Sequence, residues 1–295
     1  MIQFFKNPNY DIVGKIKITT ILSAVIILLG LGSIAFQGLH YGIDFEGGTL
    51  MQLKFEDETT AGELRELLKS PELGKPVIQK SAENEYMIRV QTFGTENTIN
   101  EKIKSDLKDK TFEVRRVEKV GPKIGAELKT SAVKAIFFAL LLILIYISVR
   151  FEFKFAVGAV IALFHDVLIT LGIFSIFQWE ISMPVLAAFL TIVGYSLNDT
   201  IVVYDRIRED IGAYKNTKTF KEIINLSINQ SLSRTVITSL TTFLVVLVLV
   251  IYGGEVLFGF SVAMLIGVVV GTYSSAFIAA PLLIYWKHKA DIKKK

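Results

Sequence analysis

The residue of this sequence best placed to do chemistry is an aspartate inside an apolar run. Asp199 and its neighbour Asn198 stand in the stretch TIVGYSLNDTIVVYDR, which carries no basic residue before Arg206. On a helix turning about 100° per residue, both share a face with Thr191 and Tyr195. An ionised aspartate inside a membrane costs about 2.5–3.5 kcal/mol on insertion scales, and such residues usually pair with a base or relay protons and ions.

Arg234 is the basic residue that could pair with Asp199. Asp199 lies near the end of its apolar run and Arg234 lies near the same end of the next run, so the two could meet at similar depth. Arg234 also shares a helical face with four hydroxyl residues, Ser231, Thr238, Thr241 and Thr242. A movement that makes or breaks the pair would bind or release a proton. A static ion pair that fixes helix packing is the alternative, and the residues alone leave both open.

His165 and Asp166 form a second ionisable pair, near the middle of the apolar run Phe155–Trp179. Adjacent side chains on a helix point about 100° apart, so the two cannot both face one partner helix. A proton path and a structural set of interhelical hydrogen bonds are equally good interpretations of this pair.

The composition indicates that a membrane positions these residues. Of the 295 residues 52% are hydrophobic, and the mean hydropathy is +0.49, which is typical of a membrane protein. Because a helix needs about 20 apolar residues to cross a bilayer, we predict six transmembrane helices, the first retained as an anchor. They are Ile18–Phe36, Ala135–Val149, Phe155–Trp179, Ile181–Tyr204, Thr235–Gly254 and Val256–Trp286.

Lysine and arginine in the short loops orient these helices. The basic residues gather at both ends of the chain, between the second and third spans, and between the fourth and fifth, which predicts that both termini are cytoplasmic. The predicted organisation has four parts. They are a cytoplasmic N-terminus with the first span (1–36), an extracytoplasmic domain (37–130), a five-helix bundle (131–286) containing a cytoplasmic amphipathic segment (205–233), and a basic cytoplasmic tail (287–295).

The segment 37–130 has the pattern of a small α+β domain. GGTLMQLKFE alternates like a strand, Thr60 and Glu63 have the spacing of a capping box, and ENTINEKIKSDLKDK has helical periodicity. The order of elements is β-α-β-β-α-β, which predicts a ferredoxin-like domain between the first and second transmembrane helices.

The last apolar run carries small residues at intervals of four or eight. Glycine and serine at this spacing allow helices to approach closely, so we interpret these residues as a packing surface. They are Gly259, Gly267, Gly271 and Ser275.

Other kinds of chemistry have little support. The chain has no cysteine, its three histidines lack the spacing of a metal site, and it has no phosphate-binding loop. Without a visible nucleophile–base pair we do not expect an enzyme, a cofactor or a nucleic-acid partner.

Several strings together resemble the SecF proteins of the SecD/SecF family of protein-export membrane proteins, in the resistance-nodulation-division (RND) superfamily. HYGIDFEGGT follows the first span, VGPKIGAEL leads into the second, and GYSLNDTIVVYDRIRE ends the fourth. ALFHDVLITLG and NQSLSRTVITSLTT complete the resemblance, which extends over nearly the whole chain.

The resemblance implies a role in protein export at the bacterial cytoplasmic membrane. Members pair with SecD, associate with the SecYEG channel, and use the proton-motive force to assist late translocation of preproteins that the SecA motor has pushed. The aspartate of the LND motif and the arginine of SRT belong to the family's proton path, and they match Asp199 and Arg234. We interpret the signature turn as structural; its residues are Tyr41, Gly42, Asp44, Glu46, Gly47 and Gly48.

Two other classes of function stay open from the residues. One is half of a small-molecule or lipid exporter, since the same superfamily supplies these, although their outer domains are usually larger. The other is a non-transporting scaffold for assembly, which predicts that Asp199→Asn leaves function intact.

Overall fold

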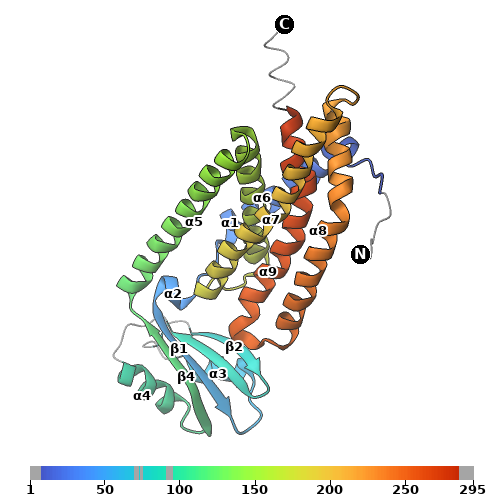
Figure 1. Ribbon diagram of the computed structural model, residues 1–295. Helices are drawn as coiled ribbons and strands as arrows, with labels where there is room; N and C mark the ends of the chain where they lie inside the picture. Colours follow the sequence, from blue (N-terminus) through green and yellow to red (C-terminus); the bar gives the residue numbers. More distant parts are fainter. Residues whose placement is uncertain (1–7, 70–72, 74–75, 91–95, 286–295) are drawn as a thin grey trace. The chain divides into compact units, whose positions relative to one another are not determined.

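The computed structural model describes residues 8–69, 73, 76–90 and 96–285, which form two compact units (Figure 1). We name them the membrane unit (residues 1–40, 135–179 and 184–295) and the sheet unit (residues 41–134 and 180–183). Each unit has its own hydrophobic core.

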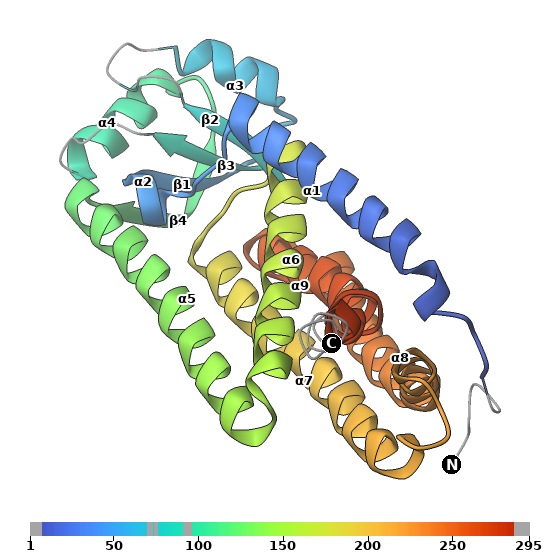
Figure 2. The ribbon, with the colours of Figure 1, turned by 90° about the horizontal axis from the view of Figure 1, so that it is seen from above.

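Within the described residues, six helices are long and apolar enough to cross a membrane, which confirms the predicted number. They are α1 (Ile16–Gln37), α5 (Pro122–Arg150), α6 (Phe153–Phe177), α7 (Met183–Tyr214), α8 (Phe220–Tyr252) and α9 (Gly254–Ser274), the last continued by a π-helical turn (Ser275–Ala279). In the membrane unit α6 packs against α1 and α9, and α9 packs against α8 (Figure 2).

The helices extend beyond the predicted spans. The second begins at Pro122, so the predicted boundary at residue 130 falls inside it. The segment 205–233 was predicted as a separate amphipathic stretch, but α7 continues to Tyr214 and α8 begins at Phe220 after a capping box between Thr219 and Glu222. Charged residues end an apolar run without ending a helix, which explains the difference. Trp286 and the predicted tail lie outside the described residues.

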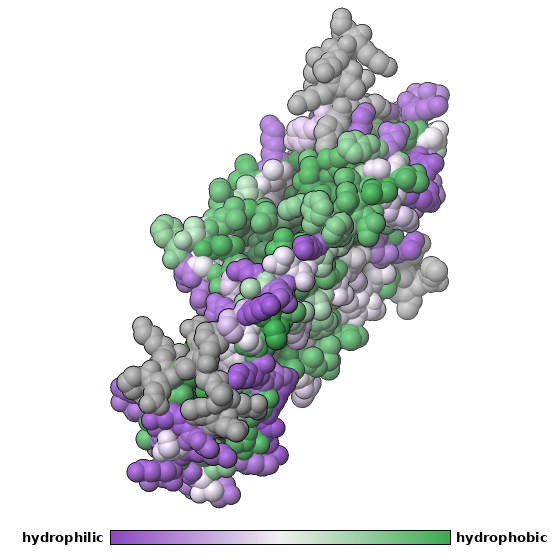
Figure 3. All heavy atoms as spheres, turned by 90° about the vertical axis from the view of Figure 1, so that its left-hand side faces the viewer, coloured by the Kyte–Doolittle hydropathy of each residue, from purple (hydrophilic) through white to green (hydrophobic). Residues whose placement is uncertain are grey.

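The surface of the helices suits a lipid environment. On the face shown in Figure 3, hydrophobic residues cover the helical flank, whereas hydrophilic residues dominate the sheet unit. Large apolar side chains are exposed along α1 and α5, among them Ile18, Ile21, Leu28, Leu29, Phe137, Phe138 and Leu142. Exposed apolar bands on helices of this length are typical of membrane spans, and the chain is a multi-pass membrane protein.

The sheet unit contains a four-stranded antiparallel sheet in the order β2-β3-β1-β4. Its elements follow the predicted β-α-β-β-α-β order: β1 (Gly48–Phe55), α3 (Ala61–Leu67), β2 (Val77–Ala82), β3 (Glu85–Val90), α4 (Glu96–Asp106) and β4 (Phe112–Val120). One core joins alternate strand residues to both helices, including Met51, Leu53, Leu64, Ile88, Ile99 and Ile103. The alternation follows from the two-residue period of a strand.

Candidate functional site

Asp199 is buried inside the membrane unit, where side chains from three helices meet. Its carboxylate, on α7, is 2% exposed and accepts a hydrogen bond at 3.0 Å from the hydroxyl of Ser239 on α8. The hydroxyl of Thr272, on α9, lies 2.7 Å from that of Ser239. A buried carboxylate joined to two neighbouring helices is well placed to respond to their movement.

The predicted contact between Asp199 and Arg234 is not formed. Arg234 is exposed, and within the described residues no ion pair joins it to Asp199. The charge of Arg234 still acts on the Asp199 carboxylate without a direct ion pair, and Ser239, about 140° further round α8, donates the hydrogen bond. The buried face of α8 carries hydroxyls four residues apart, at Ser227, Ser231, Thr235 and Ser239.

Asn198 is also exposed, although it was placed with Asp199 on one face. The step of about 100° between neighbouring residues is sufficient to bury one and expose the other. Asn198 on α7 and Arg234 on α8 therefore give the membrane unit exposed polar side chains beside a buried carboxylate.

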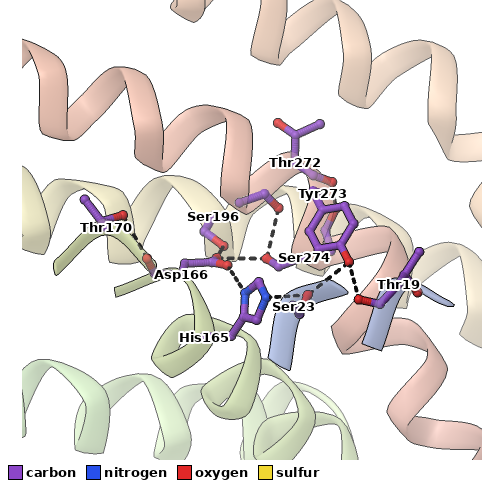
Figure 4. A network of polar contacts seen from close by, with 11 residues as sticks. Thr19, Ser23, His165, Asp166, Thr170, Ser196, Thr272, Tyr273 and Ser274 are labelled. Atoms are coloured by element: carbon purple, nitrogen blue, oxygen red, sulfur yellow. Dashed lines mark hydrogen bonds and ion pairs between the residues drawn. The ribbon is translucent and has the colours of Figure 1, made fainter. Parts of the chain in front are cut away.

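His165 and Asp166 form a second buried polar cluster (Figure 4). The two side chains bond each other at 2.9 Å, between Nδ1 of His165 and Oδ1 of Asp166. The other imidazole nitrogen contacts Ser23 of α1 at 2.9 Å. The other carboxylate oxygen accepts from Ser196 of α7 at 2.6 Å and from Ser274 of α9 at 2.8 Å. The sequence predicted that the two could not both face one helix, but both contact α9, His165 by stacking on Tyr273 and Asp166 through Ser274.

The helix α9 contributes to both clusters through three consecutive residues. Thr272 lies in the Asp199 cluster, while Tyr273 and Ser274 lie in the His165–Asp166 cluster. The π-helical turn Ser275–Ala279 follows directly. Because π-helical turns are often found at functional sites, this segment of α9 is where a shift of one helix would change both clusters.

The signature turn lies in the sheet unit and is held by residues 180–183. Gly42 donates its N–H to the carbonyl of Ile181 at 2.8 Å. The carboxylate of Asp44 accepts from the backbone of Met183 at 2.7 Å. A side chain at position 42 would collide with Glu180 and Ile181, which explains the glycine there.

The remaining residues of the turn have geometric and electrostatic roles. Gly47 and Gly48 have φ angles of 78° and 132°, which only glycine adopts easily. Buried Arg89 forms an ion pair with Glu180 and donates to the carbonyl of Tyr41 at 3.4 Å. Burial lowers the pKa of Arg89, while the negative charges of Glu46 and Asp44 act in the opposite direction.

The small residues of α9 lie against α7. A side chain at Gly267 would collide with Ile192, and one at Gly271 would come within 2.9 Å of Ser196. Gly259 is half-buried, and Ser275 is buried, donating to the carbonyl of Thr272 at 2.9 Å.

Sequence reasoning missed the hydroxyl residues that surround the two carboxylates. They are Ser23, Ser196, Ser239, Thr272, Tyr273 and Ser274. Two signals in the sequence could have pointed to these hydroxyls. Ser196 lies one helical turn before Asp199, and the string GTYSS concentrates polar residues in the otherwise apolar α9.

Comparison with known proteins decides the family. The profile of the C-terminal region of the protein export membrane proteins SecD/SecF matches residues 99–289, and that of the SecD/SecF GG motif matches residues 32–58. The chain belongs to the SecD/SecF family. It is 46% identical to the protein translocase subunit SecF of Rhodothermus marinus, over 99% of this chain and 98% of that one. The SecF of Calditerrivibrio nitroreducens is 45% identical over 96% of both chains. The function of the present chain is that of a SecF subunit of the protein translocase.

Solved structures of SecDF have the same fold. A crystal structure of SecDF from Thermus thermophilus, described as a translocon-associated membrane protein, matches with a TM-score of 0.87 and 38% identity over 96% of this chain. A structure of SecDF in a super-membrane-facing form matches with a TM-score of 0.75 and 36% identity over 99% of this chain. The SecF-family chain spans 39% and 41% of those two SecDF chains.

Proposed function

We propose that this chain pairs with a SecD protein and converts proton movement across the bacterial cytoplasmic membrane into late steps of preprotein export. The observation that carries the proposal is the buried carboxylate of Asp199, which is bonded to α8 through Ser239. A carboxylate inside a membrane-spanning bundle is a functional feature by default. Its burial is costly, and such residues commonly mark proton or ion pathways.

The exposed polar side chains of Asn198 and Arg234 support pairing with a second membrane protein. An arginine on the lipid-facing surface of a span costs several kcal/mol less when another helix supplies polar partners. The solved relatives contain SecD and SecF in one chain, of which this chain matches the SecF-like two fifths. A SecD protein is therefore the partner that we propose to cover this surface, in a complex that acts with SecYEG and SecA-driven preproteins.

The arrangement in the membrane is part of the proposal. The positive-inside pattern supports cytoplasmic termini and an extracytoplasmic sheet unit. The sheet order β2-β3-β1-β4, with α3 and α4 in one shared core, supports the ferredoxin-like class for that unit.

The energy available is sufficient for a conformational step. One charge that crosses 100 mV yields about 2.3 kcal/mol. Since about 1.4 kcal/mol corresponds to a factor of ten, one proton could shift a two-state equilibrium by roughly fifty-fold.

The test is export into membrane vesicles that carry the Asp199→Asn variant. We expect the part of export that depends on the proton-motive force to be lost while SecD co-purifies normally. Ser261→Ala, which changes a buried hydroxyl of α9 that makes no hydrogen bond within the described residues, serves as the control. Normal export by Asp199→Asn would overturn the coupling role and leave the chain an assembly scaffold.

A further inference from the structure

The hydroxyl chain around His165 fixes the direction of each of its hydrogen bonds. The chain runs from the carbonyl of Thr19 through Tyr273 and Ser23 to the Nε2 atom of His165, with distances of 2.8, 3.0 and 2.9 Å (Figure 4). A carbonyl only accepts, so the single proton of the Tyr273 hydroxyl points to Thr19. Its direction determines every later donor in the chain.

The remaining assignments follow one after another. The single hydroxyl hydrogen of Tyr273 is already donated to Thr19, so Ser23 is the donor in its contact with Tyr273. The only hydroxyl hydrogen of Ser23 is then in use, so in the contact with His165 the imidazole must be the donor. The Nε2 atom of His165 therefore carries a hydrogen.

The other side of the imidazole fixes the number of protons held by the pair. Nδ1 of His165 and Oδ1 of Asp166 share a hydrogen bond at 2.9 Å, which requires one proton between them. Together with the hydrogen on Nε2, the pair holds two protons, one more than a neutral histidine beside a carboxylate. Ser196 and Ser274 both donate to the other oxygen of Asp166, at 2.6 and 2.8 Å.

Burial supports the same count. Asp166 is 0% exposed and His165 is 6% exposed. The groups that contact them from α1, α7 and α9 are hydroxyls, of which only that of Tyr273 is titratable, and a further carboxylate, Asp199, follows three residues after Ser196 on α7. Among the described residues no counter-charge contacts the pair, so the pair with two protons is neutral, whereas loss of one would leave a net negative charge inside the membrane unit.

We propose that His165 and Asp166 form a second proton-binding site, occupied in this structure, and that the Ser23–Tyr273 hydroxyl chain controls its release. When Nε2 gives up its proton to a water molecule, the Ser23 hydroxyl turns its hydrogen towards Nε2. Tyr273 must then turn its own hydrogen to Ser23, which breaks the bond between α9 and the Thr19 carbonyl of α1. Proton release is thus coupled to loss of a contact between α1 and α9.

The number of protons on the His165–Asp166 pair follows from the hydrogen-bond geometry, while a role of their release in export rests on the proposed function. The test is nitrogen NMR of the full chain in lipid nanodiscs, labelled with ¹⁵N-histidine, from which the spectrum of His165→Gln is subtracted. We expect both ring nitrogens of His165 to carry hydrogen at pH 7. A neutral imidazole with a bare Nε2 would overturn the proposal.

Two variants test the control by the hydroxyl chain. In Tyr273→Phe the Ser23 hydroxyl loses its acceptor and can donate to Nε2, so we expect the NMR signal of hydrogen on Nε2 of His165 at pH 7 to be lost. Ser23→Ala, which removes the acceptor for Nε2–H, is expected to weaken the same signal and serves if Tyr273→Phe does not fold. Tyr285→Phe, at a tyrosine that is 57% exposed, is the matched control. An unchanged Nε2 signal in Tyr273→Phe would overturn the control by this chain. Because NMR does not depend on export, these results are separate from those of Asp199→Asn.

Discussion

Asp199 is bonded to Ser239 of α8 and not to Arg234 of the same helix. The serine hydroxyl is therefore in direct hydrogen-bond contact with this carboxylate, while Arg234 acts on it through its charge alone. Asp199 and Ser239 lie on different helices, so their hydrogen bond also ties α7 to α8.

Ser239→Ala should weaken both the packing and the coupling. The substitution removes the donor to Asp199 and the hydroxyl beside Thr272, and we expect a loss of about 0.6–2 kcal/mol of stability, the range of interhelical hydrogen bonds in membranes. Export driven by the proton-motive force should fall, but less than in Asp199→Asn. Thermal unfolding in detergent and export into vesicles measure the two effects. Ser261→Ala should be neutral, and an equal loss in both serine variants would show that the Ser239 bond has no special role.

A backbone contact between α1 and α6 makes another prediction. A side chain at Gly30 would come within 2.8 Å of the Cα atom of Gly172, and backbone cannot move aside as a side chain can. We expect Gly30→Ala to lower stability by about 1–3 kcal/mol, the usual cost of overpacking. Gly32→Ala, in the same helix with open space around it, is the control and should be neutral or stabilising. A comparison of melting temperatures decides, and equal melting temperatures would contradict the close approach of α1 and α6.

The sheet unit should lose stability in acid through Glu63. The ammonium of Lys110, 2.8 Å from the Glu63 carboxylate, lowers the pKa of that group, opposed by desolvation and assisted by a hydrogen bond from the backbone of Thr60. A lowered folded pKa means that the contribution is present above the unfolded value of about 4.3 and is lost as pH falls through the folded value.

Hydrogen exchange of the amides of α3 at several pH values measures this contribution. Protection in Glu63→Gln should be lower than in the wild type at pH 7 and equal to it in strong acid. Lys110→Met removes the main cause and should reduce the pH dependence. If the protection of the α3 amides differed between the wild type and Glu63→Gln by the same amount at every pH, the effect could not come from the charge of Glu63.

The N-terminal segment is held to α8 by two asparagines. Asn225 accepts from the backbone of Ile12 and Val13 at 2.9 and 3.0 Å, and Asn229 accepts from Tyr10 at 2.8 Å. We expect Asn225→Ala to increase hydrogen exchange at these amides by roughly five- to tenfold, as the loss of about 1 kcal/mol implies. Asn225→Asp keeps the acceptor and should retain more protection. Unchanged exchange in both variants would show that the segment is held by other contacts.

The sequence predicted the elements of this fold well because their periodicities are local. Apolar runs revealed all six helices, and the alternation in GGTLMQLKFE revealed β1. The helix ends were less predictable, since Tyr204 ends an apolar run but the backbone hydrogen bonds of α7 continue for ten residues, to Tyr214. A hydropathy pattern describes the solvent around a helix, and not where its backbone bonds end.

The candidate site was predictable only in part, for a geometric reason. Asp199, His165 and Asp166 are conspicuous as ionisable groups in apolar runs, whereas Ser239 is one of many hydroxyls. A helical wheel gives the angles between side chains of one helix but not the rotation of that helix against its neighbours. One residue of rotation is about 100°, the angle between Thr238 and Ser239, so the wheel could not show that Ser239 would contact Asp199 directly and Arg234 would not.

The length of α8 has a mechanical consequence. The helix runs without interruption for 33 residues, which is about 50 Å, well beyond the thickness of the bilayer core of about 30 Å. Ser239, which donates to Asp199, and Asn229, which accepts from the backbone of Tyr10, are ten residues apart on this one helix, or about 15 Å. A tilt of this helix that follows a change of charge at Asp199 would therefore displace the backbone around Tyr10. A fluorescent probe attached near Tyr10 would then serve as a gauge of events inside the bilayer.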